Sequence, residues 1–164
     1  SVLGQSSRFR IALPWLAPPA TQPPLADAPA PGPAPAVAPD HPKPTILLVE
    51  DHESNVIVLR DMLEAQGYRL AVAYTGSDGL TQARAARPDL ILMDIQLPGM
   101  SGLDVIQRIR ADTRLPRMPI VALTALVMPG DRERCLQAGA DEYLAKPVAM
   151  HTLLTAIARL LARP

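Results

Sequence analysis

The sequence of 164 residues has little of several features that direct proteins to particular functions. One cysteine excludes an internal disulfide and fits a reducing compartment. Aromatic residues make up only 3%, which disfavours a stacking platform for single-stranded nucleic acid. Lysine plus arginine number 16, as do aspartate plus glutamate, and this zero formal charge argues against a polyanion-binding protein. The apolar runs are too short to span a bilayer. We therefore expect a cytoplasmic location and no nucleic-acid partner.

Proline is the one residue in excess, and its distribution divides the chain. Twelve of the 19 prolines lie in residues 1–44, and residues 15–44 hold eleven prolines and eight alanines. Proline fixes φ and lacks an amide donor, so neither helix nor sheet can propagate through this segment. We predict a semi-rigid linker over residues 15–44. A ligand for a proline-reading domain around Pro31 and Pro33 is the alternative.

Residues 1–14 differ from the linker. Phe9, Ile11 and Leu13 alternate with residues that are polar or small, which is typical of a half-buried strand. One strand cannot bury a face alone, so we interpret residues 1–14 as the end of a larger upstream domain. A secretory signal is excluded because the apolar stretch is short and Pro14 interrupts it.

Residues 45–164 alternate between strand and helix patterns, with two continuous apolar runs, TILLV and DLILM. This alternation predicts an α/β domain with a doubly wound, five-stranded parallel sheet and five helices. Strands are expected at 45–49, 69–74, 89–93, 118–123 and 143–145, and helices at 54–66, 77–87, 101–111, 130–138 and 150–161.

Five polar residues follow the predicted strands. Glu50 and Asp51 follow the first strand, Asp94 the third, Thr124 the fourth and Lys146 the fifth. Because ligands bind at the carboxyl ends of parallel strands, we expect these side chains to form one site. Each residue alone has a structural explanation as a helix cap or turn residue, but five matching strand ends favour a functional site.

The carboxylates in this cluster predict a magnesium site. Three close carboxylates repel one another, and a hard divalent cation relieves that repulsion. We predict Asp51, Asp94 and the backbone carbonyl of Gln96 as ligands, with Glu50 acting through water. A carboxylate held near Mg²⁺ can attack phosphorus, and Asp94 is the candidate nucleophile because it is the terminal residue of the central strand. Mg²⁺, Lys146 and the Thr124 hydroxyl would then surround the transferred group and stabilise its negative oxygens.

These residues lie in recognisable motifs. Residues 45–163 resemble the receiver domain of two-component response regulators through ILLVEDHESN, PDLILMDIQLPGMSGLD, PIVALTA and GADEYLAKP. The resemblance implies a flavodoxin-like sheet of order 2-1-3-4-5. It also implies that Asp94 takes a phosphoryl group from phosphohistidine, that Glu50 and Asp51 form the Mg²⁺ pocket, and that Thr124 and Lys146 contact the phosphoryl group. No small-molecule substrate beyond a phosphodonor is expected.

The same family implies a switch and a partner. On phosphorylation, Thr124 would move toward the phosphoryl group and Tyr143 would turn inward; a half-buried strand aromatic is the structural alternative for Tyr143. The peptide bond before Pro147 is expected to be cis. The partner would be a histidine kinase or a histidine phosphotransfer protein.

The first predicted helix suggests where that partner docks. Helical spacing places Asn55, Val58, Leu59 and Met62 toward the sheet and leaves Val56 and Ile57 facing outward. The predicted docking residues are Asn55, Val56, Ile57 and Pro147. His52, beside the acids, is expected to point away from them.

The two ends of the chain suggest a context. Residues 4–14 resemble the closing strand of histidine-kinase ATP-binding domains, although the second glycine of the preceding turn is missing. We interpret the chain as the C-terminal part of a hybrid sensor histidine kinase. This segment would then catalyse only its own phosphorylation and dephosphorylation, and the intact chain would be a protein-histidine kinase.

Three alternatives remain open. The first is a free-standing single-domain response regulator. The second is a haloacid-dehalogenase-like phosphatase, which normally has a second aspartate where this chain has Gln96. The third is a flavin-binding module, which would need a phosphate-cradling loop in place of the acids after the first strand.

Overall fold

A computed structural model describes residues 43–125 and 130–162. The predicted strand over residues 1–14 and the predicted linker up to residue 42 lie outside the described residues. Among the helices that are described, none combines the length and the apolar character needed to cross a membrane.

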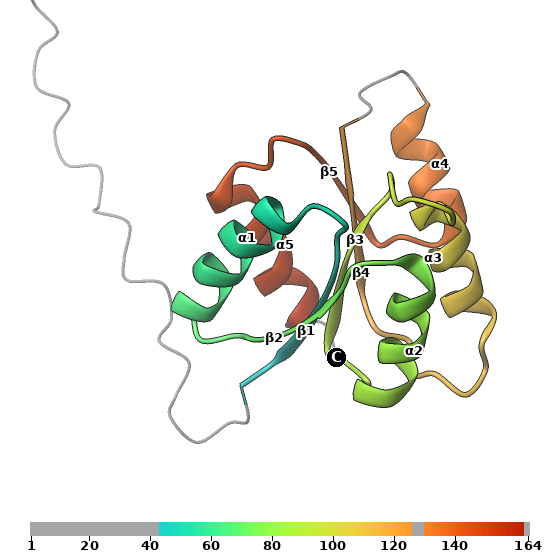
Figure 1. Ribbon diagram of the computed structural model, residues 1–164, viewed down its shortest axis with the longest axis horizontal. Helices are drawn as coiled ribbons and strands as arrows, with labels where there is room; N and C mark the ends of the chain where they lie inside the picture. The colour runs from blue at the N-terminus through green and yellow to red at the C-terminus, as the bar shows by residue number, and fades with distance from the viewer. Residues whose placement is uncertain (1–42, 126–129, 163–164) are drawn as a thin grey trace, which may run out of the picture. The chain divides into compact units, whose positions relative to one another are not determined.

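The described domain alternates five strands with five helices, as predicted (Figure 1). The strands are all parallel and hydrogen-bonded in the order β2-β1-β3-β4-β5, which confirms the predicted sheet. The elements are β1 (Thr45–Val49), α1 (Glu53–Ala65), β2 (Arg69–Ala73), α2 (Gly76–Ala86), β3 (Leu90–Asp94), α3 (Gly102–Ala111), β4 (Ile120–Thr124), α4 (Asp131–Ala138), β5 (Glu142–Ala145) and α5 (Met150–Leu161).

The sheet separates two apolar cores. Helices α1 and α5 cover one face, and α2, α3 and α4 cover the other (Figure 1). Along β1, Leu47 and Val49 face the second group of helices, whereas Ile46 and Leu48 face the first. A strand buried on both faces needs apolar residues at every position, which explains the continuous runs in the sequence.

The element boundaries follow local chemistry and agree with the predicted ones to within one or two residues. The Ser101 hydroxyl caps α3 by accepting a hydrogen bond from the amide of Leu103 at 3.2 Å, so this residue precedes the helix rather than opening it. Pro119 has no amide to donate, and β4 begins one residue after it. After α1, Gly67 adopts a left-handed φ of 88°, the conformation that ends helices at glycine.

Helix α1 corrects one prediction about which residues face the core. Val56 is 1% exposed and Leu63 is fully buried, whereas Ile57 and Val58 are 51% and 55% exposed. The predictions that Val56 faces a partner and that Val58 faces the sheet are therefore wrong. The first two turns of α1 carry four consecutive apolar residues, so periodicity supports two faces equally well, and packing selects Val56 and Leu63.

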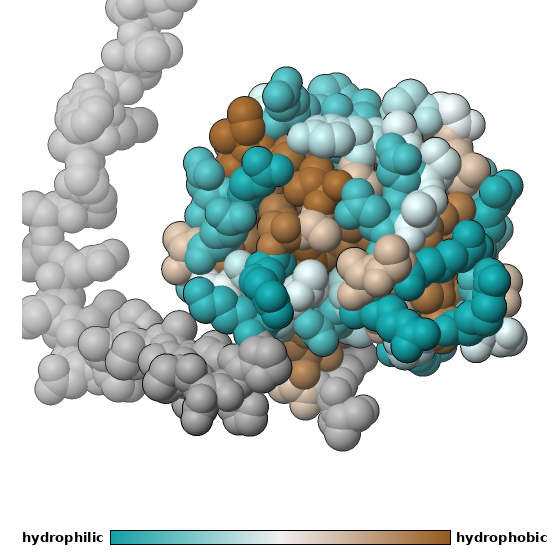
Figure 2. Space-filling model, turned by 60° about the horizontal axis from the view of Figure 1, so that its bottom comes forward, coloured by the Kyte–Doolittle hydropathy of each residue, from teal (hydrophilic) through white to brown (hydrophobic). Residues whose placement is uncertain are grey.

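Apolar surface is unevenly distributed over the domain. Figure 2 shows apolar side chains gathered over one part of the visible face, beside largely hydrophilic surroundings. Among the described residues, the large apolar side chains most exposed to solvent are Ile57, Val58 and Tyr74. Two of these three residues lie on α1, and exposed apolar side chains of this kind often mark a surface that binds a partner.

At the amino ends of β4 and β5, Arg110 connects several segments. This α3 side chain donates to the carbonyls of Met118 and Gly139, each at 2.8 Å, and to the Asp141 carboxylate at 2.6 Å. Asp141 also accepts a hydrogen bond from the amide of Ile120 at 2.9 Å. Burial lowers the pKa of Arg110, and Asp141 opposes that shift. The contacts fix the edge of the sheet opposite the predicted site.

Candidate functional site

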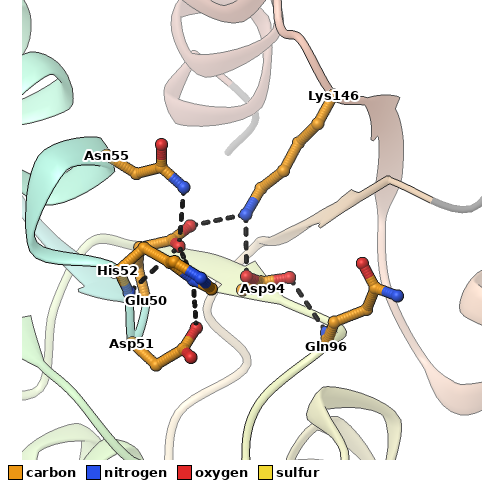
Figure 3. A network of polar contacts seen from close by, with 7 residues as sticks. All are labelled: Glu50, Asp51, His52, Asn55, Asp94, Gln96 and Lys146. Atoms are coloured by element: carbon orange, nitrogen blue, oxygen red, sulfur yellow. Dashed lines mark hydrogen bonds and ion pairs between the residues drawn. The ribbon is translucent and has the colours of Figure 1, made fainter.

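The predicted site residues converge at the carboxyl ends of the strands. Glu50 and Asp51 follow β1, Asp94 ends β3, Thr124 ends β4, and Lys146 follows β5. Figure 3 shows the two acids that follow β1, Asp94 of β3 and Lys146 of the β5–α5 segment pointing toward one another. A parallel sheet places these chain positions at one edge although they lie far apart in sequence.

Lys146 joins two carboxylates at the centre of the site. Its Nζ lies 2.6 Å from Glu50 Oε2 and 2.7 Å from Asp94 Oδ2 (Figure 3). Burial alone lowers the pKa of Lys146, but the hydrogen bonds and charges of Asp94 and Glu50 outweigh burial and raise it. The backbone amide of Lys146 also donates to the carbonyl of Thr124 at 2.7 Å. A charged ammonium is therefore held beside Asp94.

Glu50 is the most enclosed acid of the site. Its side chain is fully buried, and Asn55 Nδ2 donates to its Oε1 at 2.9 Å, while Lys146 occupies its Oε2. Asn55, predicted as a docking residue, thus anchors Glu50 from the first turns of α1. A buried carboxylate is costly unless such donors pair with its oxygens. Sequence reasoning missed this contact.

Asp94 is fixed from both sides. It is 3% exposed, its Oδ1 accepts from the amide of Gln96 at 2.9 Å, and its Oδ2 accepts from Lys146. Behind it, α3 begins in close contact, because a Cβ on Gly102 would stand 2.0 Å from the carbonyl oxygen of Asp94. Only glycine permits this approach. The carboxylate is therefore preorganised by neighbours that leave little freedom for displacement.

His52 lies differently from its predicted place. Its Nδ1 is 3.0 Å from Asp51 Oδ1 and 3.5 Å from Glu50 Oε1 (Figure 3). The prediction that His52 points away rested on strand alternation, but β1 ends at Val49 and His52 is the residue preceding α1. Strand alternation does not extend beyond the strand, so the imidazole turns over the acids.

The donor atoms of the site fit a hard divalent cation. One ligand atom from each of Glu50, Asp51 and His52 lies within 4.8 Å of the others. The Asp51 side chain is 22% exposed, so a hydrated ion has access to it, and Asp94 is brought to the same edge of the sheet. Mg²⁺ binds through one or two carboxylates and keeps several waters, which suits these acids.

Thr124 and Tyr143 occupy neighbouring strands near the site. Thr124 is 1% exposed, and Tyr143, half-buried on β5, pairs in register with Ala122 of β4. A pocket of about 160 Å³ opens beside Thr124 and is bordered by α4 residues that include Cys135. Cys135 is 2% exposed and packs in the core on this side of the sheet, and burial raises the pKa of its thiol, so it is a packing residue.

A second hollow lies between α1 and the segment that follows β5. Its volume is about 510 Å³. The Lys146–Pro147 peptide bond beside it is cis, as the resemblance implied. The residues lining this hollow are Glu50, Asn55, Val58, Leu59, Leu123, Ala125, Lys146, Pro147 and Val148. An apolar groove is thus joined to the polar site at Glu50 and Lys146.

Known proteins match this chain over most of the described domain. Residues 46–158 match the family model of the response regulator receiver domain. The polar-differentiation response regulator DivK of Brucella anthropi is 42% identical over 113 residues, which are 69% of this chain and 92% of that protein.

Solved structures give the same result. The receiver domain of sensor histidine kinase PA1611 from Pseudomonas aeruginosa, solved with a magnesium ion coordinated in the active-site cleft, is 41% identical with a TM-score of 0.69. The match covers 74% of this chain and 100% of that one. The signal receiver domain of a signal transduction histidine kinase from Syntrophus aciditrophicus is 32% identical with a TM-score of 0.68, covering 73% and 90%.

Proposed function

The chain belongs to the response regulator receiver family, and from this premise we propose that Asp94 accepts a phosphoryl group from a phosphohistidine. The observation that carries the proposal is the position of Asp94 beside the Lys146 ammonium, which also contacts Glu50, one of the acids that follow β1. A fixed carboxylate beside a fixed cation is suited to attack phosphorus and to stabilise the charge that is transferred.

The proposed reaction moves one phosphoryl group. A bond forms between an Asp94 carboxylate oxygen and phosphorus while the bond from phosphorus to the histidine nitrogen of the donor breaks. The electron pair of the broken bond stays on that nitrogen, which takes a proton from solvent. Lys146 then shifts from pairing with the Asp94 carboxylate to pairing with the new phosphoryl oxygens, and Thr124 offers a hydroxyl at the adjacent strand end.

We propose that Asp51, Asp94 and the Gln96 carbonyl hold Mg²⁺, with Glu50 in contact through water. The bound ion supplies positive charge for the transferred oxygens. Support comes from the oxygen donors gathered at this edge and from the PA1611 receiver, which was solved with a magnesium ion coordinated in its active-site cleft. Glu50 is held by Asn55 and Lys146, which suits a residue that positions the ion's water rather than the ion itself.

The phosphoryl group is proposed to act as a switch through Thr124 and Tyr143. A new dianion at Asp94 adds contacts that exist in only one state, and such differential contacts shift a two-state packing. The pocket of about 160 Å³ beside Thr124 provides space for that residue's surroundings to repack. The half-buried position of Tyr143 on the neighbouring strand is compatible with this role.

Receiver domains interact with histidine kinases or phosphotransfer proteins, and we propose that this one docks them over α1 and the segment after β5. Ile57, Val58 and Pro147 are exposed there, and the groove between these elements opens at Lys146. A partner helix laid in this groove would bring its phosphohistidine close to Asp94. The proposed docking surface therefore includes Ile57 and Pro147, as predicted from the sequence. It includes Val58 in place of the buried Val56.

The hybrid-kinase context stays a proposal. It is supported by two similar solved receivers, both of which belong to histidine kinases. DivK, a response regulator almost wholly covered by the match, illustrates the alternative. Phosphate would pass in the hybrid case from a kinase histidine to Asp94 and then to another histidine.

Intact-protein mass spectrometry tests the proposed chemistry. The chain is incubated with acetyl phosphate and Mg²⁺, beside Asp94→Asn and a sample with a metal chelator. We expect one phosphoryl adduct in the wild-type protein with Mg²⁺ and none in the other samples. An adduct in Asp94→Asn would move the acceptor elsewhere, and the absence of any adduct would overturn the proposal. Multiple-turnover hydrolysis of a generic phosphate ester would favour the phosphatase instead.

A further inference from the structure

We propose that His52 supplies a nitrogen ligand to the acidic pocket, so that the pocket also takes a first-row transition-metal ion such as Co²⁺ or Zn²⁺. The inference rests on the proposed metal pocket but assigns a further ligand in it. Its basis is the position of the imidazole, which turns over Asp51 and Glu50 rather than away from them (Figure 3).

The distances suit a shared ion. Metal bonds to nitrogen and oxygen are about 2.0–2.2 Å long, so two neighbouring ligands of one ion stand roughly 3–3.5 Å apart. His52 Nδ1 is 3.0 Å from Asp51 Oδ1 and 3.5 Å from Glu50 Oε1. An ion bound to Asp51 Oδ1 can therefore also bind His52 Nδ1 with little movement of the backbone, while Glu50 Oε1 stays in contact with its water.

The imidazole also has room to rotate into this role from its contact with Asp51. It is 67% exposed, so small rotations of the ring meet few packed neighbours. His52 precedes α1, yet its side chain makes no capping hydrogen bond to that helix. The backbone amide of His52 contacts Glu50 Oε1 at 3.4 Å, which holds the residue over the acids. Position and freedom together favour a ligand over a helix cap.

The ligand type decides which ions gain from His52. Mg²⁺ prefers oxygen ligands and gains little from nitrogen, whereas Co²⁺, Ni²⁺ and Zn²⁺ are well matched to imidazole. A pocket of carboxylates with one imidazole thus shifts selectivity toward transition metals. The competing explanation is a simple ion pair between a protonated His52 and Asp51, which would give no such shift.

Titrations with Co²⁺ and Mg²⁺ at neutral pH test the proposal on the full 164-residue chain. Co²⁺ binding is followed by its visible absorption, and Mg²⁺ binding by displacement of Co²⁺ and by calorimetry. The variant is His52→Asn, and the matched control is His151→Asn, an exposed histidine on α5 outside the site. Nuclear magnetic resonance of the histidine ring protons provides a second readout, because a paramagnetic ion shifts a ligating ring strongly.

We expect the ratio of Co²⁺ to Mg²⁺ affinity to fall at least about tenfold in His52→Asn, the loss that even indirect partners of a metal commonly cause. The ratio should not change in His151→Asn, and Co²⁺ should shift the His52 ring. An unchanged ratio in His52→Asn, or an unshifted His52 ring, overturns the inference while leaving the Mg²⁺ pocket intact. If neither ion binds the wild-type protein, the inference and the proposed pocket fail together.

Discussion

Lys146 Nζ lies 2.7 Å from Asp94 Oδ2, and this ion pair connects the ends of two strands that do not neighbour each other in the sheet. The same ammonium lies 2.6 Å from the fully buried Glu50 carboxylate. One cation thus offsets part of the charge of two acids that would otherwise repel each other. A bound divalent ion would share this task, so Lys146 and the metal act on the same charges.

Replacing Lys146 by methionine should leave the carboxylates of Glu50 and Asp94 to repel each other. We expect the free energy of unfolding without metal to fall by about 3 kcal/mol, the lower end of the range for breaking a buried ion pair, because Lys146 is 19% exposed. Mg²⁺ should raise the melting temperature more in Lys146→Met than in the wild type. Thermal unfolding with and without Mg²⁺ measures both. The exposed Lys43 provides the control Lys43→Met, and an equal response to Mg²⁺ in all three proteins would contradict this account.

Stability measurements can separate the two faces of α1. Val56→Ala should lower the free energy of unfolding by about 2 kcal/mol, because two buried methyl groups are lost at roughly 1 kcal/mol each. Ile57→Ala, at a position 51% exposed, should change it by less than about 0.5 kcal/mol. Urea denaturation measures the pair, and a larger loss in Ile57→Ala would reverse the assignment of the buried face.

The proposed docking surface predicts a kinetic effect that depends on the phosphodonor. In the double variant Ile57→Ser, Val58→Ser we expect phosphotransfer from a phosphohistidine protein to slow at least about tenfold relative to the reaction with acetyl phosphate. Burial of one such side chain contributes about 1.5 kcal/mol or more, which corresponds to that factor. Rates from both donors, measured side by side, give the ratio. An unchanged ratio would place docking elsewhere.

Gly102 is expected to tolerate no side chain. A Cβ there would stand 2.0 Å from the Asp94 carbonyl oxygen and 2.8 Å from Ile95 Cα, and backbone atoms cannot yield as a flexible side chain does. Gly102→Ala should therefore lower the free energy of unfolding by about 1–3 kcal/mol and slow phosphorylation of Asp94 as its strand end shifts. Gly67→Ala is the control for backbone conformation without crowding. Gly67 has a left-handed φ of 88°, but no atom lies within 4 Å of a Cβ built there. This variant should lower stability without slowing phosphorylation.

We expect the amino-end edge of the sheet, which Arg110 holds, to be destabilised without affecting phosphorylation at the carboxyl-end edge. Arg110→Met removes the donor to two carbonyls and to Asp141, and we expect about 2–4 kcal/mol of lost stability from the unpaired groups. Phosphoryl acceptance from acetyl phosphate should persist at temperatures where the variant is folded. Lys at this position should recover only part of the stability, because it lacks the planar fork of donors. Loss of acceptance in a folded Arg110→Met protein would show that the edges are coupled.

The sequence alone determined the alternation of strands and helices and the five polar residues that meet at one edge of the sheet. Continuous apolar runs predict strands buried on both faces, and the residue that follows each such strand needs no tertiary information to be identified. Glu50, Asp51, Asp94, Thr124 and Lys146 all lie where the strand order places them. A parallel sheet converts the order of strands along the chain into one shared edge, so periodicity was sufficient.

Only the tertiary structure decided how side chains beyond the strand ends are oriented. Val56 and Val58 lie two positions apart in an apolar stretch of α1, and only packing against the sheet selects Val56 for the core. His52 and Asn55 lie past the end of β1, where the backbone turns into a helix and strand alternation no longer fixes direction. Their contacts with Asp51 and Glu50 arise from that turn. Arg110 finds its acceptors 8 to 31 residues away, and a separation of that size becomes a contact only when the chain has folded.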